Sequence, residues 1–277
     1  MARPVPADFN AVLADAVRYF ADRGYQSADD VALWVARLRQ AAEDSLLSEQ
    51  EVERQIKASL GGVFDRFVTR GKIAERVQGV GLWTIERVRP ALRAELDRRI
   101  LAAANQIKLN RVAAIEKSLQ RFAGWSTSIP AGGTEVLDRR EVKGEIGKSI
   151  AQIRYEARRV AIDQGHKLIA NVSEIVALDG GAIAAIWHDR GEHDPSYNAR
   201  KEHLARSGKI FLVRDSWAIR DGLVRRGSRP YTDEIERPAE AVYCSCFYEW
   251  ITALRRLPAE TLTAKGRAAL SGNREAA

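Results

Sequence analysis

The chain has 277 residues, of which 45% are hydrophobic and 29% are charged, a composition typical of one large globular domain or two ordinary ones. Lys and Arg exceed Asp and Glu by seven, which permits contact with nucleic acid or an acidic partner without requiring it. No apolar run reaches about 18 residues, so we expect no transmembrane helix. The acidic Asp8 and Asp15, with no apolar segment beside them, argue against a signal peptide.

The first 67 residues predict three amphipathic helices. Apolar residues recur at spacings of three and four from residue 7 to residue 23, and Gly24 ends this pattern. Ser27 is suited to cap a second helix. A capping box at 48–51 begins a third helix, which continues through Gly61 and its neighbouring glycine with a kink.

The longest predicted helix covers residues 91–123, which contain neither Gly nor Pro. Pro90 is assigned to its first turn, where the missing N–H is tolerated. Such a helix would be about 50 Å long, which suits either an arm that reaches a neighbouring subunit or a bundle within a monomer. Gly124 is predicted to end it, with a loop at 126–133.

A further helix is predicted at 142–168, with Glu156 able to reach cations on the same helix. After the turn at 179–181 the pattern changes to short runs typical of strands. Strands are expected at 182–187, 209–214 and 242–248, a hairpin at 216–225 with a type I′ turn at Asp221–Gly222, and a short helix at 197–207 that Gly208 stops.

These elements predict an α+β protein with a mainly helical N-terminal region containing long helices. A small mixed α/β domain with an antiparallel sheet follows it. The predicted divisions are a helical bundle or arm at 1–180, the small domain at 181–257, and a C-terminal tail at 258–277 that can form one more helix.

The small domain contains three of the four histidines and both cysteines of the chain. Two thiolates and two imidazoles would complete a tetrahedral zinc site, and the candidate ligands are His203, Cys244, Cys246 and either His188 or His193. In a straight strand, however, residues i and i+2 are about 7 Å apart, so both sulfurs could reach one ion only if the chain turned at Ser245. The alternative is that two reduced thiols pack beneath the sheet.

A second hypothesis is a metal-dependent protein that binds or cleaves DNA. One histidine would activate water while others hold a divalent ion, and basic side chains would contact phosphates. The candidate metal-site residues are His188, Asp189, His193, Asn198 and His203, and the candidate contacts to nucleic acid are Arg200, Lys201, Arg225, Arg226 and Arg229. Their spacing fits no nuclease signature, and charged loops are more simply explained as surface.

An ordered set of short motifs spans this region over roughly a hundred residues. It comprises a helix with Ile153, Glu156 and Arg159, then Trp187, Arg200 with His203, Gly208-Lys209-Ile210-Phe211, Pro230, and Cys244-Ser245-Cys246. This order resembles the C-terminal domain of the phage head morphogenesis family, the minor head proteins similar to protein F of bacteriophage Mu. The chain departs from many relatives in two places: Arg200–His203 stands where they have Cys-x-x-Cys, and Ser245 where they have Arg.

The resemblance implies a structural, non-enzymatic minor capsid protein of a tailed phage, built into the virion in the host cytoplasm. Such a protein acts in head assembly at or near the portal vertex or in the head interior. Its expected partners are the portal protein, the major capsid protein or both, and packaged DNA is a further candidate. Several copies per virion and no membrane are expected. No cofactor is required, although zinc remains an option.

Overall fold

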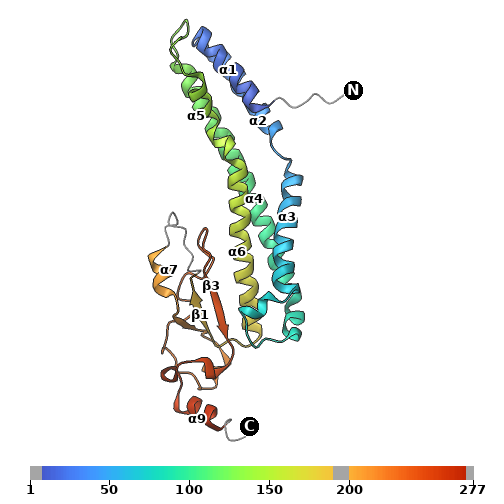
Figure 1. Ribbon diagram of the computed structural model, residues 1–277, viewed down its shortest axis with the longest axis vertical. Helices are drawn as coiled ribbons and strands as arrows, with labels where there is room; N and C mark the ends of the chain where they lie inside the picture. The colour runs from blue at the N-terminus through green and yellow to red at the C-terminus, as the bar shows by residue number, and fades with distance from the viewer. Residues whose placement is uncertain (1–7, 190–199, 273–277) are drawn as a thin grey trace. The chain divides into compact units, whose positions relative to one another are not determined.

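The computed structural model describes residues 8–189 and 200–272. It is 67% helical, with long N-terminal helices and a small antiparallel sheet near the C-terminus, so the predicted α+β class is confirmed. Most of the elements are labelled in Figure 1. The α-helices and strands are α1 (Phe9–Arg23), α2 (Ala28–Ser45), α3 (Glu49–Phe64), α4 (Leu82–Ser128), α5 (Arg139–Ala151), α6 (Ile153–Asp179), β1 (Ala184–His188), α7 (Lys201–Arg206), β2 (Ile210–Leu212), α8 (Trp217–Arg220), β3 (Phe247–Ile251) and α9 (Ala264–Gly272).

The chain divides into two compact units. Unit 1 consists of residues 1–56 and 102–160, and unit 2 consists of 57–101 and 161–277. The predicted boundary at residue 180 differs from this division, because residues 57–101 and 161–180 group with the sheet. The three passages between the units fall within α3, α4 and α6.

Unit 1 is a helical bundle made by α1, α2, α5 and the part of α4 that follows residue 101. Phe20 and Phe122 are fully buried at its centre, and their rings meet edge to face with centroids 5.7 Å apart. The buried residues of α1 recur at the predicted helical spacing. Arg39 and Glu116 form a bidentate ion pair between α2 and α4.

A tight crossing fixes the end of α1. Gly24, with φ of 73°, lies so close to the loop after α4 that a Cβ would come 1.9 Å from the carbonyl oxygen of Pro130. The backbone N–H of Thr134 donates to Ala21 O at 2.9 Å. Only glycine allows this approach without strain.

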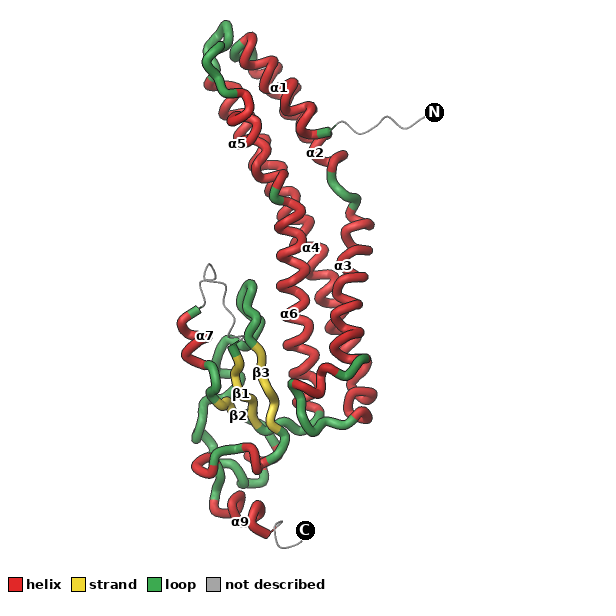
Figure 2. Tube along the Cα trace, in the orientation of Figure 1, coloured by secondary structure: helices red, strands yellow, loops and turns green. Residues whose placement is uncertain are grey.

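Unit 2 is built on a three-stranded antiparallel sheet of order β2-β1-β3, shown in yellow in Figure 2. Because side chains alternate along a strand, β1 presents Ala185 and Trp187 on one face and Ala184, Ile186 and His188 on the other. Val77 adds a parallel bridge to Trp250 of β3. The segment before α4 thus extends the sheet and helps to bury Trp250.

Three predicted helix boundaries were wrong. The helix α4 begins at Leu82 and not at Pro90, which lies inside it. Pro90 is exposed, so the carbonyl that loses its partner at this turn remains open to solvent. Gly124 does not end α4, which continues to Ser128. The helix predicted at 142–168 is two helices, since α5 ends at Ala151 and α6 begins at Ile153.

Two predicted β elements also differ. Residues 216–225 contain the short helix α8 and no hairpin. Asp221 has φ of −79° and ends α8, while Gly222 adopts φ of 70°, a glycine C-cap in place of a type I′ turn. The strand predicted at 242–248 begins only at Phe247.

The C-terminal segment belongs to the core of unit 2. Leu257 and Leu262 are buried with Ile183, Leu212 and Ile251. The segment predicted as a tail therefore contributes to folding. Among the described residues, no helix is both long and apolar enough to cross a bilayer.

Candidate metal centre

His203 lies on α7, which connects β1 to β2. Arg200 precedes the first turn of α7, and Gly208, with φ of 74°, follows its last turn. The N–H of Gly208 donates to Trp187 O at 2.8 Å, and the N–H of Trp187 donates to Lys209 O at 3.0 Å. These bonds attach the end of α7 to β1, and His203 is buried, at 4% exposed for the whole residue.

Cys244 and Cys246 lie in an irregular segment immediately before β3. Tyr243, which precedes them, has φ of 60°, a left-handed conformation that is uncommon outside glycine. Its backbone N–H donates to Asp163 Oδ1 of α6 at 2.8 Å. The objection that a straight strand would separate the two sulfurs does not apply, because residues 244–246 precede β3 and do not lie in a strand.

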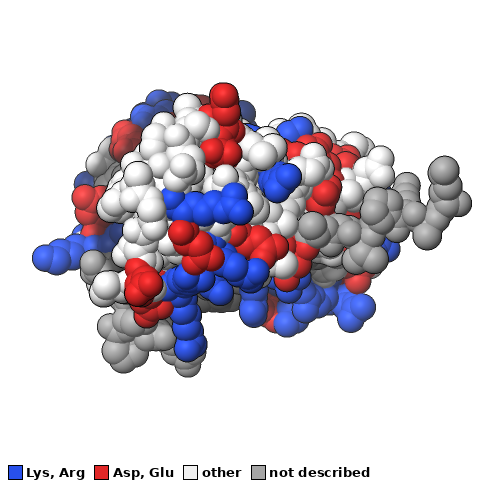
Figure 3. Space-filling model, turned by 90° about the horizontal axis from the view of Figure 1, so that it is seen from above, with Lys and Arg blue, Asp and Glu red and all other residues white. Residues whose placement is uncertain are grey.

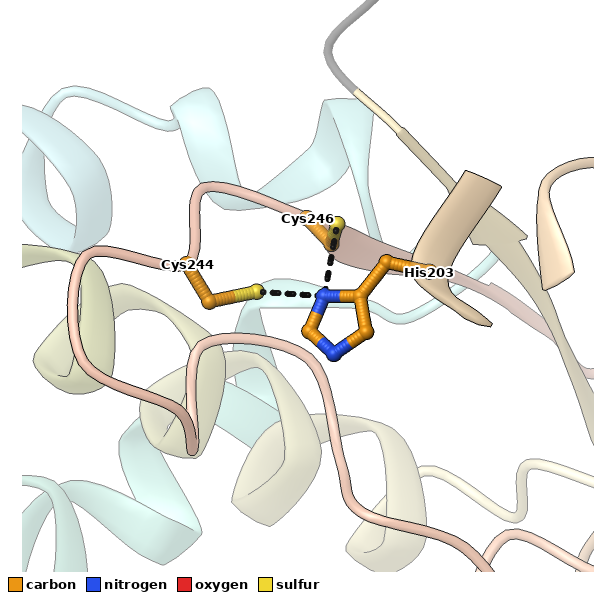
Figure 4. A group of neighbouring side chains, drawn as sticks. All are labelled: His203, Cys244 and Cys246. Atoms are coloured by element: carbon orange, nitrogen blue, oxygen red, sulfur yellow. Dashed lines mark hydrogen bonds between the residues drawn. The ribbon is translucent and has the colours of Figure 1, made fainter. Parts of the chain in front are cut away.

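The donor atoms of His203, Cys244 and Cys246 converge, as Figure 4 shows. His203 Nδ1 is 3.4 Å from Cys244 Sγ and 3.7 Å from Cys246 Sγ, and the three donor atoms all lie within 4.8 Å of one another. Bonds of about 2.3 Å to sulfur and about 2.1 Å to nitrogen place the S···N edge of a zinc tetrahedron at about 3.6 Å. Both observed separations match this edge, so the residues fit a zinc ion.

The two free cysteines differ in acidity. A hydrogen bond from the Cys246 thiol lowers the pKa of Cys244, and the N–H of Ala239 donates to the same sulfur at 3.3 Å. The pKa of Cys246 is raised, because it gives this hydrogen bond to Cys244 and because it is buried. The pair thus favours one thiolate, the form in which cysteine binds metals.

His188 is not part of this group. It lies on the sheet face opposite Trp187, where its Nε2 is 2.9 Å from Glu249 Oε2 and its ring stacks on Phe247. The structure therefore does not bring His188 to the cysteines. His193 and Asn198 lie outside the described residues. Asp189, another candidate from the sequence, does reach this group: its Oδ1 is 3.8 Å from Cys246 Sγ.

Glu236 is a member of the centre that the sequence analysis missed. Its Oε2 is 3.1 Å from His203 Nε2, the ring nitrogen that faces away from the sulfurs. No spacing signal singles out this residue, because it lies 33 positions from His203 in an irregular segment. Trp187 packs edge to face on the His203 ring, with centroids 5.3 Å apart.

The candidate residues for contact with nucleic acid do not form one patch of free cations. Arg225 donates to the backbone oxygen of Glu260, and Arg229 forms an ion pair with the same residue at 2.6 Å. Lys201 and Arg226 are exposed. On the face shown in Figure 3, basic and acidic side chains are intermixed over the described residues.

Most motif residues of the family resemblance meet around His203. Trp187, Gly208 and Lys209 are joined by the backbone bonds described above, and Arg200 donates to Val242 O at 3.1 Å, two residues before Cys244. Glu156 is not a member of this group. It belongs to unit 1, where its Oε1 is 3.7 Å from Arg159 Nη1.

The chain matches no protein-family model, no curated protein and no solved structure. Its function is therefore inferred from the residues and geometry of this centre.

Proposed function

We propose that the chain is a structural minor head protein of a tailed phage that acts in capsid assembly at or near the portal vertex or in the head interior. One observation carries the proposal. Trp187, Arg200, His203 and the Cys244–Cys246 pair, which are spread along 60 residues of sequence, form one connected cluster. If these motif residues define a domain, they are expected to lie together in the folded chain. Residues that match a motif only by chance are expected to lie apart.

A structural role suits the cluster better than catalysis. All three donor side chains are buried, which leaves an ion held by them little access to a phosphate or another large substrate. A nuclease would need an accessible ion beside phosphate-binding cations, yet Arg225 and Arg229 are engaged by Glu260. We therefore expect no enzymatic activity.

We further propose that zinc occupies the centre, held by His203, Cys244 and Cys246. The ion would supply a cross-link between α7 and the segment before β3. Purified protein is expected to contain stoichiometric zinc and to lose it when either cysteine is replaced by serine, as measured by elemental analysis. Zinc near background after purification without chelator would contradict this proposal.

The test of the head-protein proposal is location. Phage particles from the strain that carries this coding sequence are separated into complete heads, empty heads and portal complexes, and each is analysed by quantitative mass spectrometry. The chain is expected with the portal and capsid proteins, in several copies per particle. Absence from all three fractions would contradict the proposal.

The competing role in DNA binding or cleavage has its own assay. Purified protein is incubated with supercoiled plasmid and Mg²⁺ or Mn²⁺, with His203→Ala as the matched control. We expect no nicking by either protein. Nicking that His203→Ala abolishes would contradict the structural role.

A further inference from the structure

The two nitrogens of the His203 ring have different surroundings. Nδ1 faces the two sulfurs at 3.4 and 3.7 Å, while Nε2 faces Glu236 Oε2 at 3.1 Å. A neutral imidazole carries one proton, and a carboxylate can accept a hydrogen bond but cannot donate one. Glu236 can therefore accept a hydrogen bond from a proton on Nε2, and this tautomer leaves the lone pair of Nδ1 directed at the cysteines.

Two contacts hold the backbone segment that contains Glu236. Its backbone oxygen accepts from Arg206 Nη1 at 3.3 Å, and Arg206 lies on α7 together with His203. The next residue, Arg237, forms an ion pair with Glu174 of α6 at 3.0 Å. These contacts bring the carboxylate to His203 and restrain it there.

We propose that Glu236 positions His203 for metal binding, an inference that rests on the proposed zinc site. It selects Nδ1 of His203 as the metal ligand and so raises the affinity of the centre for Zn²⁺. Carboxylates that hold the second nitrogen of a ligand histidine fix its tautomer and ring orientation, and their loss typically weakens metal binding about 10- to 100-fold.

The exposure of the two side chains separates this role from a purely structural one. His203 is 5% exposed at its side chain, whereas Glu236 is 41% exposed. Half-exposed ion pairs contribute little to folding, so removal of the Glu236 carboxylate should leave the metal-free protein nearly as stable as before. The effect should appear in metal binding.

The test uses the full chain in three variants. Glu236→Ala removes the acceptor, Glu236→Gln keeps an acceptor oxygen without the charge, and Glu202→Ala removes an equal charge from an exposed position next to His203. Zinc affinity is measured by competition with a chromophoric chelator. We expect Glu236→Ala to lose about 10- to 100-fold in affinity, Glu236→Gln to recover much of that loss, and Glu202→Ala to match the wild type.

A spectroscopic measurement identifies the ligating nitrogen. In protein loaded with ¹¹³Cd and labelled with ¹⁵N, we expect coupling of the metal to Nδ1 of His203 and a protonated Nε2 in the wild type. Coupling to Nε2, or an affinity of Glu236→Ala equal to that of the wild type, would overturn the role of Glu236 while leaving the zinc site in place. Failure of the wild type to bind either metal would overturn both, and the location of the chain in phage particles would remain a separate test.

Discussion

Replacement of Asp163 by alanine should loosen the turn that carries the cysteines. Asp163 of α6 is 9% exposed at its side chain. Its Oδ1 accepts from the N–H of Tyr243 at 2.8 Å, and its Oδ2 accepts from Lys167 Nζ at 2.8 Å. The first bond holds Tyr243 at its φ of 60°, a conformation that costs roughly 1–2 kcal/mol in a residue with a Cβ.

The expected cost is the sum of two contributions. Loss of a hydrogen bond to a charged acceptor destabilises by about 1.5–3 kcal/mol. Loss of the ion pair with Lys167, whose side chain is 18% exposed, adds up to about 1 kcal/mol. We therefore expect Asp163→Ala to lower the free energy of unfolding by about 1.5–4 kcal/mol.

The assay combines urea unfolding with amide hydrogen exchange at neutral pH in the presence of chelator. Lys167→Met is the matched control, because it removes the ion pair and keeps the bond to Tyr243. Asp163→Ala should lose stability and expose the Tyr243 amide to exchange, while Lys167→Met should lose less and keep that amide protected. An Asp163→Ala protein with wild-type stability and a protected Tyr243 amide would refute the reasoning.

Three further predictions concern stability. The pKa of Glu95 is lowered, because hydrogen bonds from Arg99 and other side chains outweigh the effect of burial. The ionised Glu95 therefore stabilises the fold above its unfolded pKa of about 4.3. This stabilisation is lost as the pH falls through the lower folded pKa. Urea unfolding of Glu95→Gln should therefore show a deficit at pH 7 that narrows below about pH 4; a constant deficit would contradict this. Gly266→Ala places a Cβ 2.2 Å from Leu223 O. It should lower the unfolding midpoint and increase hydrogen exchange in α9. Unchanged exchange in α9 would show that Gly266 does not pack against Leu223. Gly24→Ala adds the cost of a left-handed residue, roughly 1–2 kcal/mol, to a backbone clash, and equal thermal stability of variant and wild type would exclude the tight crossing.

Helix positions were predictable where apolar periodicity carries the signal, and helix ends were less so. The buried residues of α1 follow the expected spacing. The predictions at Pro90 and Gly124 were wrong because neither residue always ends a helix. Proline matters where its missing N–H leaves a buried carbonyl without a partner, and glycine where the backbone leaves the helical conformation. Pro90 is exposed, and Gly124 keeps the helical conformation through to Ser128.

The Asp221–Gly222 pair shows a second limit. The same two residues suit a hairpin turn or the end of a helix, because both require a residue with positive φ. The choice depends on tertiary contacts. Thr263 donates its hydroxyl to Gly222 O at 2.7 Å, from a segment about 40 residues away that local sequence patterns do not reach.

The candidate metal ligands were predictable by residue type but not by arrangement. His203, Cys244 and Cys246 were candidates because imidazole and thiolate are the ligands that zinc prefers. The segment that carries the two cysteines begins at a left-handed Tyr243, whose backbone N–H is bound by Asp163, 80 positions away. Neither this turn nor the contact of Glu236 with His203 has a local sequence signature.

The division of the chain also limits how this fold can be inherited or dissected. Residues 102–160 of unit 1 interrupt unit 2, and each passage between the units lies within a helix. A gene fragment that encodes only residues 181–277 would lack Val77, the bridge partner of Trp250, and Asp163, which holds the cysteine turn. Recombination could not transfer unit 2 as one uninterrupted coding segment, so its exchange between genomes would require residues 102–160 of unit 1 to move with it.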